Sequence, residues 1–309
     1  MKVLIVGLGS IARKHIAALY KIIPEVTIYA LRSSVSSKEM ENIISIYDTK
    51  ELPDNIDFAI ISNPTSLHGQ TIEKLLDLKI PLFIEKPVFD KLEYDTLIER
   101  INQAHIPTYV ACNLRFLDCI RYLHDYLIEN PGRRINEVNV YCGSFLPDWR
   151  PGVDFRECYS AIPELGGGVN IDLIHDIDYT YWIFGKPEKS FGFCRNVSSL
   201  NIRAFDYAHF SFLYPTFTAS ITLNYYRRDY RRMIEILFDD VTWTADLSKN
   251  IIVDQDNNIV FEGTDKPIDT YTAQLEYFIK SIKDHSKIEN DVNTAYEVLK
   301  ICLDYERLS

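Results

Sequence analysis

Residues 3–12 read Val-Leu-Ile-Val-Gly-Leu-Gly-Ser-Ile-Ala, a run rich in β-branched residues that leads directly into a glycine-rich turn. Such a run is typical of a parallel strand buried on both faces, and an amphipathic helix follows the turn. Gly7 permits the tight turn, Gly9 lets the backbone approach a ligand closely, and Ala12 permits close helix–strand packing. The first N–H groups of the helix can bind phosphate. Strand, turn and helix together predict a dinucleotide-binding unit rather than an ordinary βα turn.

Further buried strands are expected at 26–31, 56–62, 81–84 and 109–112, with a helix at 69–78. Alternating strands and helices predict a parallel sheet with right-handed crossovers. Ligands bind outside the carboxyl ends of such strands. Several polar or glycine-rich groups fall at those ends, namely Gly7–Gly9, Arg32, Asn63–His68 and Glu85–Pro87.

The end of the second expected strand indicates which coenzyme the sheet binds. Domains specific for NAD usually place an acid there for the ribose 2′-hydroxyl. This chain has Leu31-Arg32-Ser33-Ser34 instead. Arg32 can pair with a 2′-phosphate, and Ser33 and Ser34 can hydrogen-bond to it. The sequence therefore predicts NADP(H) in preference to NAD(H), the alternative being an arginine exposed in a loop.

The composition excludes several classes of protein. The chain has 309 residues, 47% of them hydrophobic, and a formal net charge of −11. Its length and apolar content predict two domains, and its acidity argues against nucleic-acid or membrane-surface partners. Six cysteines without a CxxC pair indicate neither a disulfide framework nor a zinc site. We expect a cytoplasmic protein with reduced thiols and no bound metal.

A second glycine-rich segment, 166–178, reads Gly-Gly-Gly-Val-Asn-Ile-Asp-Leu-Ile-His-Asp-Ile-Asp. Residues three or four apart lie on one face of a helix, so Asp172, His175 and Asp176 are expected to be neighbours. A titratable cluster beside a flexible glycine entry favours a small-molecule acid–base site. The alternative is a surface helix with solvated acids.

Beyond residue 118 the pattern changes to alternating polar and apolar runs, which predict an antiparallel sheet with one face buried. Its other face needs cover, so we expect a homodimer or homotetramer formed through this sheet. Within this half, Trp149 offers a flat face for a sugar ring, and Arg150 and Arg156 offer forks for a carboxylate or phosphate. The alternative for each of the three is an anchor within a loop.

Five segments together resemble the Gfo/Idh/MocA oxidoreductase family. In order along the chain they are GLGSIA (7–12), NPTSLH (63–68), EKP (85–87), NLRF (113–116) and GGGVNIDLIHDID (166–178). The resemblance implies an α/β protein with an N-terminal Rossmann domain, residues 1–117. Residues 118–309 would form an α/β domain with a large, mainly antiparallel sheet. The C-terminal helices would pack back on the first domain.

The resemblance also implies residue roles. The coenzyme would contact Gly7, Gly9, Ser10, Ile11, Asn63, Pro64, His68, Glu85 and Lys86, with Arg32 and Ser33 added from the strand end discussed above. Lys86 corresponds to the family's active-site lysine, and Asp172 and His175 to its downstream acid and histidine. Substrate would contact Asn113, Arg115, Trp149, Arg150, Arg156, Asp172 and Asp176.

The predicted function is NAD(P)-dependent hydride transfer at a hydroxyl-bearing or carbonyl carbon of a sugar or sugar derivative, such as a nucleotide sugar. His175 is the expected general acid and base, because its ordinary pKa lies near working pH. Lys86 would stabilise alkoxide charge, and either residue could carry the proton. The run 146–156 is similar to a branch associated with bacterial surface-sugar biosynthesis. Alternatives are a non-catalytic NAD(P)-binding regulator on the same fold, or a dehydrogenase of a non-sugar substrate.

Overall fold

The computed structural model describes residues 1–34 and 40–307, and the chain divides into two compact units. The first unit comprises Met1–Asn113 with Ile268–Glu297, and the second comprises Leu114–Pro267 with the residues from Val298 onward. The division at Glu297 and Val298 falls within helix α8, Val292–Leu303. The first unit is therefore built from two separate stretches of the chain.

The first unit contains a parallel sheet of six strands in the order β3-β2-β1-β4-β5-β6. The strands are β1 (Lys2–Val6), β2 (Thr27–Leu31), β3 (Ile43–Ile46), β4 (Phe58–Ile61), β5 (Leu82–Glu85) and β6 (Thr108–Ala111). Strands β1, β4, β5 and β6 are buried along nearly their whole length, as the apolar runs predict. The sequence analysis did not predict β3, which has four residues and forms an edge of the sheet.

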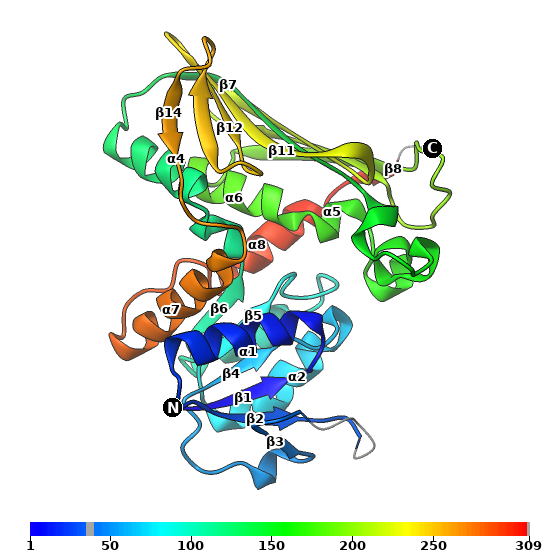
Figure 1. Ribbon diagram of the computed structural model, residues 1–309, viewed down its shortest axis with the longest axis vertical. Helices are drawn as coiled ribbons and strands as arrows, with labels where there is room; N and C mark the ends of the chain where they lie inside the picture. The colour runs from blue at the N-terminus through cyan, green and yellow to red at the C-terminus, as the bar shows by residue number, and fades with distance from the viewer. Residues whose placement is uncertain (35–39, 308–309) are drawn as a thin grey trace. The chain divides into compact units, whose positions relative to one another are not determined.

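Four helices of the first unit accompany these strands: three lie between them in the sequence, and α7 joins from the C-terminal part of the chain (Figure 1). They are α1 (Ser10–Ile22), α2 (His68–Leu75), α3 (Asp95–Gln103) and α7 (Asp269–Lys283). Helices α1 and α7 lie side by side, and the Lys14 ammonium donates to the Tyr271 hydroxyl at 3.3 Å. The Phe278 ring packs edge-on against Phe58 and Phe83 at 5.3 and 5.5 Å between centroids. Helix α7 therefore contributes directly to the core under the parallel sheet.

The second unit contains a sheet of nine strands in the order β14-β13-β12-β11-β7-β10-β9-β8-β15. The strands are β7 (Ile135–Phe145), β8 (Lys189–Arg195), β9 (Tyr207–Leu213), β10 (Thr218–Asn224), β11 (Tyr226–Phe238), β12 (Thr242–Asp246), β13 (Ile251–Asp254), β14 (Ile259–Glu262) and β15 (Glu306–Arg307). Neighbours are antiparallel except the β10–β7 and β15–β8 pairs. The predicted fold class, a Rossmann domain plus a large, mainly antiparallel sheet, is confirmed.

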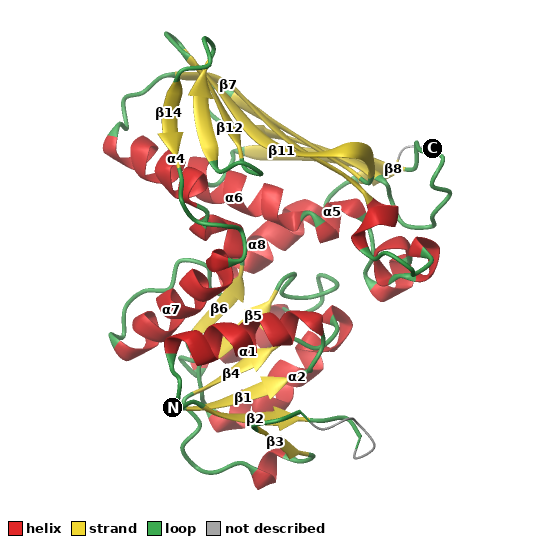
Figure 2. Cartoon of the chain, viewed as in Figure 1, coloured by secondary structure: helices red, strands yellow, loops and turns green. Residues whose placement is uncertain are grey.

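Helices α4 (Asp118–Glu129), α5 (Val169–Asp172) and α6 (Ile174–Phe184) run along one face of this sheet (Figure 2). Strand β9 alternates buried and half-buried residues along its length, as expected when only one face is covered by helices. In the part of the chain that the structure describes, no helix has the length and apolar content needed to cross a lipid bilayer.

The segment 166–178 is not one continuous helix, which corrects the sequence prediction. Helix α5 ends at Asp172, and α6 begins at Ile174. Leu173 lies between them with φ −94° and ψ 26°, outside the α-helical region. The periodicity that made Asp172 and Asp176 neighbours holds only within an unbroken helix, so their side chains must be traced one by one.

Candidate active site

The glycine turn of the first unit has the geometry that phosphate binding needs. Gly7 has φ +90°, and a Cβ atom there would lie 2.6 Å from the Asn63 Cα and N atoms. Only glycine therefore fits this position. Gly9 is the N-cap of α1 without a side-chain cap, and a Cβ atom there would meet nothing within 4 Å. The first-turn residues Ser10 and Ile11 thus begin a helix whose N–H groups are open to an anion.

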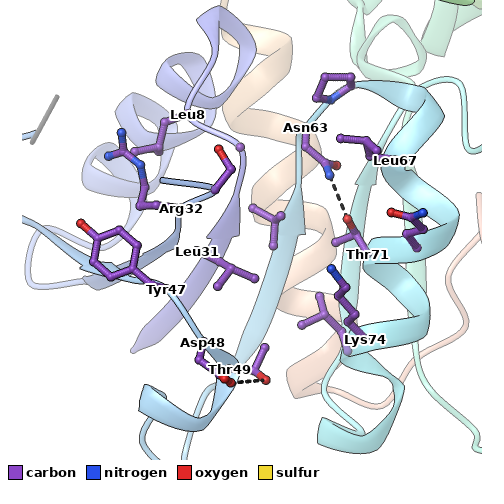
Figure 3. A pocket seen from close by; sticks show the side chains of 16 residues that line it. Leu8, Leu31, Arg32, Tyr47, Asp48, Thr49, Asn63, Leu67, Thr71 and Lys74 are labelled. Carbon is purple, nitrogen blue, oxygen red and sulfur yellow. Dashed lines mark hydrogen bonds between the residues drawn. The ribbon is translucent and has the colours of Figure 1, made fainter. Parts of the chain in front are cut away.

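A cavity of about 900 Å³ lies next to this turn (Figure 3). This volume is within the range of small-molecule sites. Five predicted coenzyme residues line it, namely Gly7, Arg32, Ser33, Asn63 and Pro64. In Figure 3 the side chains of Arg32 and Tyr47 lie on one side, and those of Asn63, Thr71 and Lys74 lie on the other. The cavity therefore joins the carboxyl ends of β1, β2 and β4 to helix α2.

The sequence analysis missed part of the cavity wall. Tyr47, Asp48 and Thr49 follow the unpredicted strand β3, while Gln70 and Lys74 come from α2. The signal that could have found the first group is the short, mainly apolar run Ile43–Ile46, which an aromatic and an acidic residue follow directly. Lys74 adds a second cation to the cavity, on the side opposite Arg32.

Asn63 shows how the cavity wall fits a polar ligand. Its Nδ2 group donates to Thr71 Oγ1 at 2.8 Å, which fixes the side chain. Its Oδ1 atom is buried without a hydrogen-bond partner among the described residues. An unsatisfied buried acceptor costs free energy unless a ligand supplies a donor. A ribose hydroxyl is such a donor, so the residues present fit the dinucleotide that the fingerprint predicts.

Glu85 and His68 were predicted to contact the coenzyme, but their polar atoms are engaged within the protein. Glu85 is 8% exposed, and its Oε1 atom lies 2.5 Å from His15 Nε2. His68 is 1% exposed, and its ring nitrogens lie 3.1 Å from the Val88 carbonyl oxygen and 3.0 Å from that of Asn63. Burial lowers the pKa of His68, which favours the neutral ring. Both residues therefore make internal contacts that link separate segments of the first unit.

Lys86 follows directly after β5, at the carboxyl end of the parallel sheet, and is half-buried. Its backbone N–H donates to Glu85 Oε2 at 3.2 Å. The lysine thus belongs to the first unit and is not among the residues that line the cavity.

In the second unit, Asp172 is the centre of a hydrogen-bonded cluster. The Tyr225 hydroxyl donates to Asp172 Oδ2 at 2.5 Å, and the Tyr159 hydroxyl also hydrogen-bonds the carboxylate. Burial and the Asp172 charge raise the pKa of both tyrosines above the ordinary value, so both stay protonated as donors. Asp172 is 7% exposed, whereas Tyr159 is 40% exposed. Sequence analysis missed both tyrosines, because no local motif marks them.

Two predicted substrate residues join this cluster. The Trp149 ring is edge-on to Tyr225 at 5.3 Å between centroids, and its Nε1–H donates to Ser144 Oγ at 3.2 Å. The Arg150 guanidinium lies 5.0 Å from the Tyr159 ring centroid. Trp149 is 37% exposed. The structure thus brings Trp149, Arg150 and Asp172 together through the two tyrosines.

Arg156 and His175 are two further predicted site residues of the second unit. Arg156 is exposed, with its guanidinium 4.4 Å from the Phe155 ring centroid and 3.8 Å from Asp154 Oδ1. His175 is the second residue of α6 and is half-buried. Both therefore share the second unit with the Asp172 cluster.

Three predicted substrate residues instead have internal partners. Asp176 is fully buried and binds Arg232. Arg115 is 4% exposed and forms a bidentate pair with Asp178 at 2.8 and 2.6 Å. Asn113 is 7% exposed and donates to Thr270 Oγ1 at 2.7 Å. Buried charged and polar groups need such partners, and Asp176, Arg115 and Asn113 find them inside the protein.

Comparison with known proteins adds to this geometry. Residues 1–110 match the oxidoreductase family GFO_IDH_MocA, described as having an NAD-binding Rossmann fold. The uncharacterized oxidoreductase YrbE of Bacillus subtilis (strain 168) is 26% identical over 192 residues, which cover 59% of this chain and 53% of YrbE. The match thus spans about half the length of this relative.

Two solved structures share the fold over nearly the whole chain. UDP-N-acetylglucosamine 3-dehydrogenase GnnA from Acidithiobacillus ferrooxidans is 19% identical, with a TM-score of 0.79 covering 99% of this chain and 96% of GnnA. The WlbA dehydrogenase from Bordetella pertussis, in complex with NADH and UDP-GlcNAcA, is 17% identical, with a TM-score of 0.77 covering 96% and 93%. At this identity the likeness shows the fold. The family likeness is therefore shown for residues 1–110, which match the Gfo/Idh/MocA oxidoreductase family, and the whole chain shares its fold with these two dehydrogenases.

Proposed function

We propose that the protein is an NAD(P)-dependent dehydrogenase or reductase acting on a hydroxyl or carbonyl carbon of a sugar or sugar derivative. The observation that carries the proposal is the cavity at the carboxyl end of the parallel sheet, with a turn that only glycine fits at Gly7. GnnA and WlbA support a nucleotide sugar as the substrate, since the first is a UDP-N-acetylglucosamine 3-dehydrogenase and the second was solved in complex with UDP-GlcNAcA.

The residues that would hold the coenzyme are Gly7, Gly9 and Ser10 at the phosphates and Asn63 at a ribose. The coenzyme, when bound, supplies the hydride chemistry. His175 would take the proton from the substrate hydroxyl oxygen during oxidation and return it during reduction. The Lys86 ammonium would stabilise negative charge on that oxygen. Asp172, held by its tyrosines, would accept a hydrogen bond from a neighbouring hydroxyl.

The proposed coenzyme preference is NADP(H), because Arg32 and Lys74 both line the cavity and the strand end carries no acid. A charged hydrogen bond to phosphate is worth about 1.5–3 kcal/mol. Arg32→Ala should therefore weaken NADPH binding by roughly 10- to 100-fold. NADH binding should change far less, and equal losses for both coenzymes would contradict the preference. Nicotinamide fluorescence titrations measure both constants.

The activity itself is tested by following nicotinamide absorbance with UDP-linked sugars, sugar acids, free hexoses and inositols. Lys86→Met and His175→Asn should each lower kcat by roughly 100-fold or more, as expected for groups acting on the transition state. If neither change lowers kcat, the assigned roles are wrong. If the wild type binds NADPH but turns over no substrate, a non-catalytic regulator becomes the better account.

The proposed assembly is a homodimer or homotetramer formed through the face of the nine-stranded sheet that α4, α5 and α6 leave uncovered. Phe191 on β8 is 59% exposed, and a broad sheet face with such residues needs cover. Light scattering on the purified protein measures the assembly, and a monomer at working concentration would contradict it.

A further inference from the structure

We propose that two buried histidines, His15 and His68, position the segment that carries Lys86. The inference rests on the proposed function in one respect, namely that the placement of Lys86 matters for activity. His68 was predicted as a coenzyme contact, and nothing in the sequence marked His15. The structure instead connects the His15 ring to Glu85, directly before Lys86, and the His68 ring to Val88, two residues after it.

His15 reaches the segment through Glu85. The ring is fully buried on α1, and its Nε2 atom lies 2.5 Å from Glu85 Oε1. The other carboxylate oxygen, Oε2, accepts the Lys86 backbone N–H at 3.2 Å. One carboxylate therefore links helix α1 to the backbone of the lysine.

The surroundings of His15 leave it no second polar role. Its ring packs edge-on against Phe83 and Tyr271, at 5.0 and 6.0 Å between centroids. Its Nδ1 atom has no hydrogen-bond partner within residues 1–34 and 40–307. A carboxylate in such apolar surroundings is stable only with a donor beside it. Without His15, Glu85 would turn toward water and release the Lys86 N–H.

His68 holds the other side of the segment. Its Nδ1 atom contacts the carbonyl of Val88, two residues after Lys86, and its Nε2 atom contacts the carbonyl of Asn63. A neutral imidazole carries one N–H, so the ring donates to one carbonyl at a time. Through either contact, His68 keeps the segment beside the loop after β4, whose residues Asn63 and Pro64 line the coenzyme cavity.

The two histidines together restrain the backbone on both sides of Lys86, and they connect it to the coenzyme loop. A reacting group displaced by about 1 Å can lose on the order of 100-fold in rate. Neither ring is expected to touch substrate or coenzyme, since they are 0% and 1% exposed. They act through Glu85 and Val88, as positioning residues.

The test uses a matched pair of variants at His15. His15→Leu removes the donor, whereas His15→Gln keeps an N–H at a position close to that of Nε2. The protein is reductively methylated with isotopically labelled formaldehyde, and the Lys86 resonance is assigned by its loss in Lys86→Arg. The resonance should move in His15→Leu and return in His15→Gln. His209→Leu removes a half-buried histidine from β9 in the second unit and should leave it unchanged.

Kinetics give the second readout once a substrate is known. His15→Leu should lower kcat by about 10- to 100-fold and leave KM and the NADPH dissociation constant within about threefold. If His15 were merely structural, His15→Leu and His15→Gln would both lower the melting temperature, and kcat would not fall separately from KM. His68→Leu should act in the same direction through the Val88 contact.

Folded His15→Leu with an unchanged Lys86 resonance and unchanged kcat would overturn the inference. If His15→Leu does not fold, His15→Asn decides, because its amide is polar yet too short to reach Glu85. An unmoved resonance in that variant would equally overturn it. If the wild type oxidises no sugar, the proposed function fails, while the resonance comparison still decides the role of His15.

Discussion

The buried pair of Asp176 and Arg232 gives the sharpest test of how the structure changes the sequence prediction. Asp176 is fully buried, and its oxygens accept from the Arg232 guanidinium at 3.1 and 2.8 Å. The Tyr179 hydroxyl donates to the same carboxylate at 2.5 Å. The Arg232 side chain is 11% exposed. The sequence placed Asp176 at the substrate, and the structure places it inside the second unit.

Asp176→Asn leaves the Arg232 guanidinium buried without its counter-ion. Breaking a buried pair by removing one partner costs about 3–5 kcal/mol. One kcal/mol shifts the melting temperature by about 2–4 °C for a domain of 150–250 residues. We therefore expect the melting temperature of the second unit to fall by roughly 6–20 °C. The asparagine carbonyl still accepts from Tyr179, so the loss comes from the charge.

Tryptophan fluorescence follows this transition selectively. The three tryptophans of the chain, Trp149, Trp182 and Trp243, all lie in the second unit. Asp176→Asn should leave NADPH binding unchanged, because the cavity belongs to the first unit. Asp240→Asn, at the exposed pair with Arg133, is the control and should barely shift the transition.

The double variant Asp176→Asn with Arg232→Met separates the charge from packing. It removes the guanidinium that the single change leaves unpaired, so it should regain much of the lost stability. An Asp176→Asn protein with wild-type stability but a raised KM for the sugar would refute this reasoning. It would show that the carboxylate reaches substrate after all.

Three further outcomes follow from the same geometry. Gly7→Ala should weaken NADPH binding at least about tenfold, because the new Cβ would lie 2.6 Å from the Asn63 backbone. Fluorescence titration measures the dissociation constant, and a value within about twofold of wild type would contradict this expectation. Tyr225→Phe should cost about 1.5–3 kcal/mol in urea unfolding, since the buried Asp172 carboxylate loses a donor, and an unchanged midpoint would count against that bond. Burial raises the pKa of the Cys142 thiol to about 12, so the folded thiol stays protonated while the unfolded one ionises above about pH 9. The free energy of unfolding should thus fall as pH rises from about 9 toward about 12, and Cys142→Ala should reduce the slope of that free energy against pH by about 1.4 kcal/mol per pH unit. An equal slope in wild type and variant would refute this role of the thiol.

The first unit was largely predictable because its signals are local. A buried strand, a glycine turn and a helix follow one another within residues 2–22, and each has its own pattern. Strand β3 escaped because an edge strand of four residues, Ile43–Ile46, gives too short a pattern to distinguish from a loop. For the same reason the sequence did not predict Tyr47, Asp48 and Thr49 as cavity residues, since their position depends on where that strand ends.

The second unit was predictable as a sheet but not as a site. Helical periodicity grouped Asp172 with Asp176, yet the chain breaks at Leu173 and the two carboxylates take different partners. Those partners, Tyr225 and Arg232, are more than fifty residues away along the chain. Long-range pairing of this kind has no period and no fixed spacing, so one sequence cannot reveal it.

Burial divides the motif residues into two groups with different expected phenotypes. Glu85, His68 and Arg115 lie inside, and each already has a partner for its polar atoms. Substituting them should change stability or the placement of neighbours, because a buried charge or ring nitrogen left alone is costly.

Trp149 and Arg150 belong to the opposite group, because they present polar or aromatic surface to solvent. The chain carries a net charge of −11, so the exposed Arg150 guanidinium, which lies over the exposed Tyr159 ring, is a candidate contact for an anionic ligand. Substituting either residue should raise KM for an acidic or phosphorylated sugar and leave the folding transition in place. The reverse pattern, lost stability with unchanged KM, would make both of them loop anchors.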